Sequence, residues 1–193
     1  MQGENRKKMR RGCDDRLDCT MNGLLEVSTL INGMLTRGTK LESAQFAKIA
    51  EAVGRVFSVR ADEVAMLSLA EDGRFLRFCV PEPLQTVGEI PVSSGSALAA
   101  RTTREKRAEI VNNFSIVPHA SVFEAVRLND QRGEPIQKIM SAPILNDGKI
   151  LGVIQVSRKA KLATSAKDFT PNDLKHLVSI AELLAPALSL FSK

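Results

Sequence analysis

The sequence contains no tryptophan or tyrosine, and only two histidines and three cysteines in 193 residues. Without Trp and Tyr, stacking on bases could use only phenylalanine, so a nucleic-acid-binding surface gains no support. The cysteines, Cys13, Cys19 and Cys79, are odd in number, and the first two have no nearby Cys or His partner. This pattern argues against a disulfide framework and against a zinc site, and it favours a reducing compartment.

Long apolar runs are also missing. No run reaches the roughly 18 residues of a membrane span, and no apolar segment of a signal peptide follows the basic start. Four of the five net positive charges lie in residues 1–11, where a basic stretch is typically solvated. We therefore expect a disordered basic tail over residues 1–20 and one domain over residues 21–193. The protein should be cytoplasmic, with no membrane insertion and no nucleic-acid partner.

The clearest positive signal is the stretch Lys138–Lys159, KIMSAPILNDGKILGVIQVSRK. Two apolar runs flank Asn146-Asp147-Gly148, which predicts a β-hairpin because Gly148 can take the positive φ of a tight turn. The second run is apolar on both alternating faces, which is typical of a central strand covered on both sides. Gly152 inside it indicates close approach by another backbone or by a ligand.

Further elements can be placed around this hairpin. Val64–Ala70 and Arg74–Val80 predict a second hairpin through Asp72-Gly73, and short strands are expected at Ile90–Val92 and Glu109–Asn112. Apolar residues at helical spacing predict amphipathic helices from Thr20 to near Gly38 and over LESAQFAKIAEAVGRVF. A short helix around Ala97–Thr102 follows the serines of SSGS, which offer capping hydroxyls.

The C-terminal helix has a strong start signal and two apolar stripes. Thr170 suits the N-cap, Pro171 the first helical position, and Asp173 the positive helix end. One stripe suffices for packing on a sheet, so the other needs a cover. We expect this helix and Leu24–Leu35 to pair with a second copy as a four-helix bundle. The residues expected at that homodimer interface are Leu24, Ile31, Leu177, Leu184 and Leu188.

The order of these elements resembles that of a GAF domain. The resemblance covers about Met21 to Phe191 and is carried by GEIPVSSGSALAARTTREKRAEI, SAPILNDGKILGVIQVSRK and FTPNDLKHLVSIAELLAPAL. It implies an α+β, PAS-related fold with a six-stranded antiparallel sheet. The N- and C-terminal helices should cover one face, and a roof of loops and short helices should cover a small-molecule pocket on the other.

The family's known ligands are not favoured by this sequence. Cyclic-nucleotide-binding members carry a five-residue motif, which Lys159, Phe169 and Asp173 match and Arg158 and Leu174 do not. We interpret Lys159 and Asp173 as a structural ion pair that ties strand to helix. A covalent bilin is unexpected because Cys79 lies on a hairpin strand, not in the roof. The methionine sulfoxide reductases of this fold use several cysteines, which the predicted domain lacks.

The expected pocket lies between Ser94 and Phe123. Free amides and hydroxyls at a short helix start suit a polar or anionic ligand, although Ser94 and Ser96 could equally be simple caps. His119 could bind a ligand or be an exposed loop residue. An apolar cavity with a few convergent polar groups is typical of a small-molecule site. The expected ligand-binding residues are Ser94, Ser96, Asn113, Phe114, His119, Phe123 and Ser141.

Two functions remain open at this point. The first is a non-catalytic sensor domain that binds a small molecule and signals through its terminal helices, as a homodimer, to a partner protein. The second is a ligand-free dimerisation module of the same fold, with its pocket filled by its own side chains. No catalytic or metal-ligating set is evident, so we do not expect an enzyme. The sequence does not identify the ligand, but with only Phe for stacking a compact one is favoured.

Overall fold

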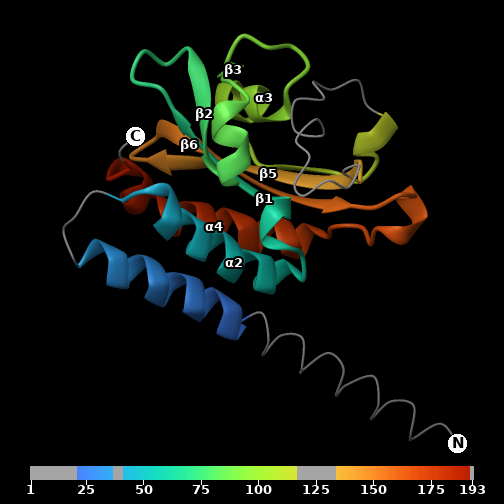
Figure 1. The fold of residues 1–193 in the computed structure, drawn as a ribbon, viewed down its shortest axis with the longest axis horizontal. Helices are drawn as coiled ribbons and strands as arrows, with labels where there is room; N and C mark the ends of the chain where they lie inside the picture. The colour runs from blue at the N-terminus through green and yellow to red at the C-terminus, as the bar shows by residue number, and fades with distance from the viewer. Residues whose placement is uncertain (1–20, 37–40, 117–133, 192–193) are drawn as a thin grey trace, which may run out of the picture.

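A computed structural model describes residues 21–36, 41–116 and 134–191 of the chain. The predicted basic tail, His119 and Phe123 lie outside these residues. Within them, a six-stranded sheet has the order β3-β2-β1-β6-β5-β4, and every neighbouring pair is antiparallel (Figure 1). The predicted α+β class and sheet are therefore confirmed. The strands are β1 Val64–Leu69, β2 Phe75–Val80, β3 Ile90–Pro91, β4 Glu109–Val111, β5 Ile136–Asn146 and β6 Lys149–Lys159.

Both predicted hairpins form, and their turns explain why. Asp147 and Gly148 connect β5 to β6 with φ values of 48° and 74°, and Gly73 in the first hairpin has a φ of 71°. Positive φ at both central residues matches the right-handed twist of the two strands. The long hairpin β5–β6 sits in the middle of the sheet, because β1 pairs with the outer edge of β6 and β4 with that of β5.

The helices lie in layers on the two sides of the sheet. α2 (Ser43–Phe57) and α4 (Pro171–Ser189) cover one face, and α3 (Leu98–Glu105) lies on the other (Figure 1). The helical residues 21–35 lie outside α2, on the side away from the sheet. The predicted N-cap of α4 is confirmed, because the Thr170 hydroxyl accepts from the Asp173 N–H and Asp173 accepts from the Thr170 N–H.

One large apolar cluster joins three helices to the sheet, namely the helix over residues 21–35, α2 and α4. Ile31, Leu177 and Leu184 are at most 1% exposed in it and Leu188 is 6% exposed, so almost none of their surface is left for a second chain. The expectation that these four residues form a dimer interface is therefore wrong. Leu24 is only partly buried against the cluster. The chain's own helices provide the cover that the second stripe of α4 needed.

The packing of β6 against β1 and α4 explains why residue 152 is a glycine. A Cβ at this position would lie 2.0 Å from the carbonyl oxygen of Leu67 on β1 and 2.7 Å from Leu188 on α4. The prediction of a close backbone approach is confirmed, and the approaching backbone belongs to the neighbouring strand.

Candidate functional site

A small cavity lies on the sheet face opposite α2 and α4. It occupies about 30 Å³, which is room for one or two water molecules. It is enclosed by the 3-10 turns η1 (Ala61–Glu63) and η2 (Glu82–Thr86) and by the beginning of β5 and the end of β6. The lining residues are Asp62, Glu63, Ala65, Pro81, Leu84, Ile136, Ile139, Gln155, Ser157 and Lys159. The cavity thus has one polar wall and one apolar wall.

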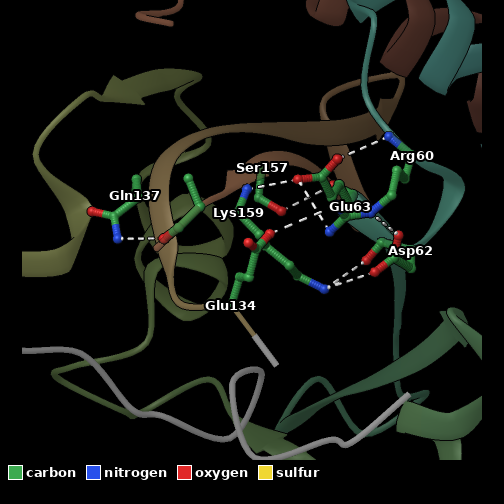
Figure 2. A network of polar contacts seen from close by, with 8 residues as sticks. Arg60, Asp62, Glu63, Glu134, Gln137, Ser157 and Lys159 are labelled. Atoms are coloured by element: carbon green, nitrogen blue, oxygen red, sulfur yellow. Dashed lines mark hydrogen bonds and ion pairs between the residues drawn. The ribbon is translucent and has the colours of Figure 1, made fainter. Parts of the chain in front are cut away.

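Glu63 is the centre of the polar wall. Its side chain is 7% exposed, and its carboxylate accepts hydrogen bonds from the backbone N–H of Lys159 at 2.6 Å and of Arg60 at 2.8 Å (Figure 2). The Ser157 hydroxyl donates to the Glu63 carbonyl oxygen at 3.1 Å. A buried carboxylate requires such donors, because its loss of hydration is otherwise unfavourable. These bonds fix η1 against the end of β6.

Lys159 extends across the same wall. Its ammonium donates to the carbonyl oxygen of Asp62 at 3.1 Å and to the Asp62 carboxylate at 3.2 Å (Figure 2). The expected ion pair between Lys159 and Asp173 is therefore wrong: Asp173 caps α4 instead. Lys159 is the last residue of β6, whereas Asp173 lies in the first turn of α4. The sequence alone did not indicate that Asp62 of η1, 97 residues before Lys159, is its partner.

The charges around Asp62 set its ionisation. Partial burial works against the charged form, but hydrogen bonds and charges from Arg60 and Lys159 outweigh it. The pKa of Asp62 is consequently lower than the usual value for an aspartate. Asp62 is thus held as an anion beside the cation of Lys159, and the polar wall contains charges of both signs.

Gln155 connects this wall to α3. Its side chain is 2% exposed and its amide donates to the Ser141 hydroxyl at 3.1 Å. Ser141 in turn shares a hydrogen bond of 2.7 Å with Thr102, whose hydroxyl donates to the Leu98 carbonyl oxygen. A buried polar chain of this kind runs from the cavity into the helix that covers the sheet.

The predicted ligand-binding residues lie at different places in this layer. Ser141 belongs to the polar chain behind Gln155, and Phe114 is buried with Leu98, Ile136 and Ile139 next to the cavity. Ser94 accepts from the Ala97 N–H just before α3. Ser96 and Asn113 are exposed, and neither lines the cavity.

Sequence reasoning missed most of the polar wall. Glu63, Gln155 and Ser157 were not singled out, and Lys159 was given a different partner. A signal was available, because Gln155 and Ser157 are polar residues at alternate positions of a strand that is otherwise apolar. Since alternate residues of a strand point to the same face, both were candidates for one site.

Arg158 lies on the other side of the strand end. Its guanidinium donates to the carbonyl oxygens of Lys167, Asp168 and Phe57, and its Cζ lies 4.0 Å from the centre of the Phe169 ring. Burial lowers the pKa of Arg158, against the opposing charges of Asp173, Glu63 and Asp168. Arg158 thus joins the end of α2 to the segment that leads into α4.

The described residues offer little support for a cysteine-based site, a metal site or a membrane span. Cys79 is fully buried on β2 in the cluster on the helix side, away from the cavity. Among residues 21–36, 41–116 and 134–191, no group of three or more His, Cys, Asp or Glu side chains could hold a metal ion. The helices of the described part of the chain are too short or too polar to cross a bilayer.

Solved structures with a similar fold come from several proteins. The GAF domain of an Acinetobacter phosphoenolpyruvate-protein phosphotransferase has a TM-score of 0.64 and 14% identity, covering 88% of this chain and 92% of its own. The A. aeolicus nlh2 GAF domain in an inactive state has a TM-score of 0.64 and 16% identity, covering 91% and 98%. Free methionine-R-sulfoxide reductase from Neisseria meningitidis, in complex with its substrate, has a TM-score of 0.62 and 15% identity, covering 89% of both chains.

These identities show the fold alone. No curated protein matches this chain. The family model described as GAF domain, however, matches residues 43–188, which span α2 to α4 and include every strand described above. The chain therefore belongs to the GAF domain family, a family of sensor and regulatory domains found in signalling proteins.

Proposed function

We propose that this domain is a regulatory sensor that binds a compact small molecule in the cavity at Glu63, Gln155 and Lys159 and acts by binding, without catalysis. The observation that carries the proposal is the polar wall. Glu63, Gln155 and Ser157 are 7%, 2% and 5% exposed, in a layer whose other cavity-lining residues are largely apolar. Packing alone would be served at least as well by apolar side chains of similar shape.

The two walls indicate the kind of ligand. Leu84, Ile136 and Ile139 would contact a short apolar part, and Gln155 and Lys159 would hold a polar end. The Lys159 ammonium has three hydrogens, and the contacts to Asp62 use two of them. A ligand larger than the present cavity must separate the apolar wall, which favours a compact molecule.

The end of β6 offers a route from the cavity to the terminal helices. Lys159 faces the cavity, while the adjacent Arg158 donates to the end of α2 and to the segment that leads into α4. A ligand that moves Lys159 would bias the position of Arg158, because the two share one strand backbone. We propose that the signal reaches a partner protein through these helices, with the domain acting as a homodimer.

A panel of small metabolites, screened by thermal shift and native mass spectrometry, tests the sensor. A compound at about 100 times its dissociation constant should stabilise the domain by about 2.7 kcal/mol. Gln155→Leu should abolish the shift. Gln137→Leu is a matched control, because Gln137 is also a buried strand glutamine but donates to the Ala160 carbonyl oxygen and does not line the cavity.

The second candidate, a ligand-free dimerisation module, is favoured by the size of the cavity. A volume of about 30 Å³ is too small for a metabolite, and Phe114 is buried in one cluster with Leu98 beside it. On this alternative, no compound shifts the melting temperature and the purified domain carries no bound molecule. A shift that survives in Gln155→Leu would also contradict a ligand site at this wall.

A further inference from the structure

The apolar wall of the cavity is divided between two clusters and two kinds of element. Ile136 and Ile139 belong to β5, which is hydrogen-bonded to β6 along its length, and they pack in one cluster. Leu84 packs in the other cluster and is the only buried residue of η2, a single 3-10 turn. Because a turn has fewer attachments than a central strand, a ligand larger than about 30 Å³ would open the cavity most easily at η2.

Gln85 connects η2 to the helix side of the sheet. Its side-chain amide donates to the carbonyl oxygen of Cys79 on β2 at 2.6 Å and to the Ser43 hydroxyl at 2.7 Å. Ser43 is the first residue of α2. Gln85 can pass the sheet here because, among the described residues, β3 pairs only with the first two residues of β2. Since Gln85 directly follows Leu84, a shift of Leu84 would pull the amide away from Ser43.

The start of α2 also meets the end of α4 (Figure 1). The Leu41 N–H donates to the carbonyl oxygen of Leu190 at 3.0 Å, and Leu41 forms an isolated bridge with Phe191. The rings of Phe46 and Phe191 meet edge to face, with their centroids 5.1 Å apart. This contact, formed by Leu41, Ser43, Phe46, Leu190 and Phe191, is called the α2–α4 joint below.

We propose that Gln85 couples the cavity to the α2–α4 joint, so that a ligand that displaces Leu84 releases the start of α2. The ligand in this statement rests on the proposed function, whereas the coupling is a property of the fold and can be measured without a ligand. Arg158 contacts the opposite helix ends, namely the end of α2 and the segment before α4. The cavity layer is thus bonded to the helix layer at both ends, through Arg158 and through Gln85.

A substitution can take the place of the unidentified ligand. Ala65 of β1 lines the cavity and pairs with Gln155 of β6, so its backbone is fixed. Ala65→Leu adds an isopropyl group to a space that holds one or two water molecules, which forces Leu84 outward. In hydrogen–deuterium exchange of the full chain, segment 41–46 should then exchange about fivefold faster, as expected for one lost hydrogen bond. Residues 177–184 in the middle of α4 report global destabilisation and should not change.

A double-mutant cycle separates coupling from simple destabilisation. Gln85→Met keeps the length of the side chain but removes its hydrogen bonds, so it should by itself speed the exchange of segment 41–46. Ala65→Leu should add little in that background, because the bond through which it acts is already missing. Ser43→Ala leaves the bond between Gln85 and Cys79 and should have the same effect as Gln85→Met.

Thr86→Val is the matched control in the same turn. The Thr86 hydroxyl donates to the carbonyl oxygen of Pro83, inside η2 rather than to α2. This variant should exchange like wild type and respond fully to Ala65→Leu. If Ala65→Leu does not fold, Ala65→Val adds a smaller group at the same position and serves for the same cycle.

The outcomes distinguish the coupling from the sensor. Additive effects of Ala65→Leu and Gln85→Met would overturn the coupling, because a merely structural glutamine adds its loss to that of any other variant. Unchanged exchange of segment 41–46 in folded Ala65→Leu would do the same. A non-additive cycle in a protein that binds no compound of the panel supports the coupling and counts against the sensor. A compound that binds without changing segment 41–46 supports the sensor and overturns the coupling.

Discussion

Ile154 and Val156 on one face of β6 join the large apolar cluster beneath α2 and α4, whereas Gln155 and Ser157 on the other face line a cavity with Glu63 and Lys159. The first face contributes stability through buried apolar area. The second face contains hydrogen-bonded polar groups in a thinner layer, where the apolar side chains form two smaller clusters. We therefore expect substitutions on the helix face to reduce stability more than those on the cavity face, and those on the cavity face to affect the proposed ligand binding.

The largest effect is expected at Gly152, where the helix face has no space. In Gly152→Val the new side chain would meet the Leu67 carbonyl oxygen and Leu188, so β1 and β6 could not keep their pairing. We expect a loss of more than about 3 kcal/mol in the free energy of unfolding, or no folded protein. Circular dichroism and urea unfolding measure this. A variant as stable as wild type would show that the two layers can separate here.

Leu184→Ala probes the helix face without a clash. Leu184 is fully buried in the apolar cluster, and its truncation leaves a cavity. The free energy of unfolding should fall by about 2–5 kcal/mol. Because Leu184 is a core residue, the oligomeric state of the folded protein should be unchanged. A folded, stable variant with altered oligomerisation would restore Leu184 as an interface residue.

Gln155→Leu is the corresponding change on the cavity face. It removes the hydrogen bond to Ser141, but Ser141 keeps its bond to Thr102. We expect the free energy of unfolding to change by about 1 kcal/mol or less. Urea unfolding beside Leu184→Ala gives the comparison directly. Equal losses in the two variants would mean that the cavity wall is as structural as the helix face.

Asp62→Asn should have the smallest effect, and one that depends on pH. Because the pKa of Asp62 is lower in the folded chain than its ordinary value, the charged form stabilises the fold above that ordinary value, about 3.9. This stabilisation is lost as the pH falls through the folded-state pKa. The side chain is 31% exposed, so solvent screening keeps the effect small.

The measurement is the difference in free energy of unfolding between wild type and Asp62→Asn, taken from neutral pH downwards. The wild type should be slightly more stable near neutral pH, and the difference should shrink below about pH 4. A difference that stays constant down to lower pH would contradict the role of the charge.

Local chemistry was enough to predict many of the elements. The positive φ values at Asp147 and Gly148 follow from the residues in the turn, and the cap of α4 follows from Thr170 and Asp173, three residues apart. In both cases the interacting groups are neighbours in sequence, so steric restriction and one hydrogen bond decide the outcome. The family resemblance then ordered these elements into the observed sheet.

The candidate site was not predictable in the same way. That Gln155 and Ser157 share a face follows from the strand, but which layer they meet depends on the register with β1 and β5. Glu63 and Lys159 are 96 residues apart, and only the folded sheet brings the Lys159 N–H to the Glu63 carboxylate. Ser96 and Asn113, which the sequence offered as donors, are exposed.

The apolar stripes of α4 show the same division. Periodicity determined that both sides of the helix are apolar, since 3.6 residues per turn place spaced residues on one face. It did not determine whether a second chain or the chain's own helices cover them, because a hydrophobic face has no preferred partner. The tertiary structure decided this by placing the helix over residues 21–35 and α2 in one cluster with α4.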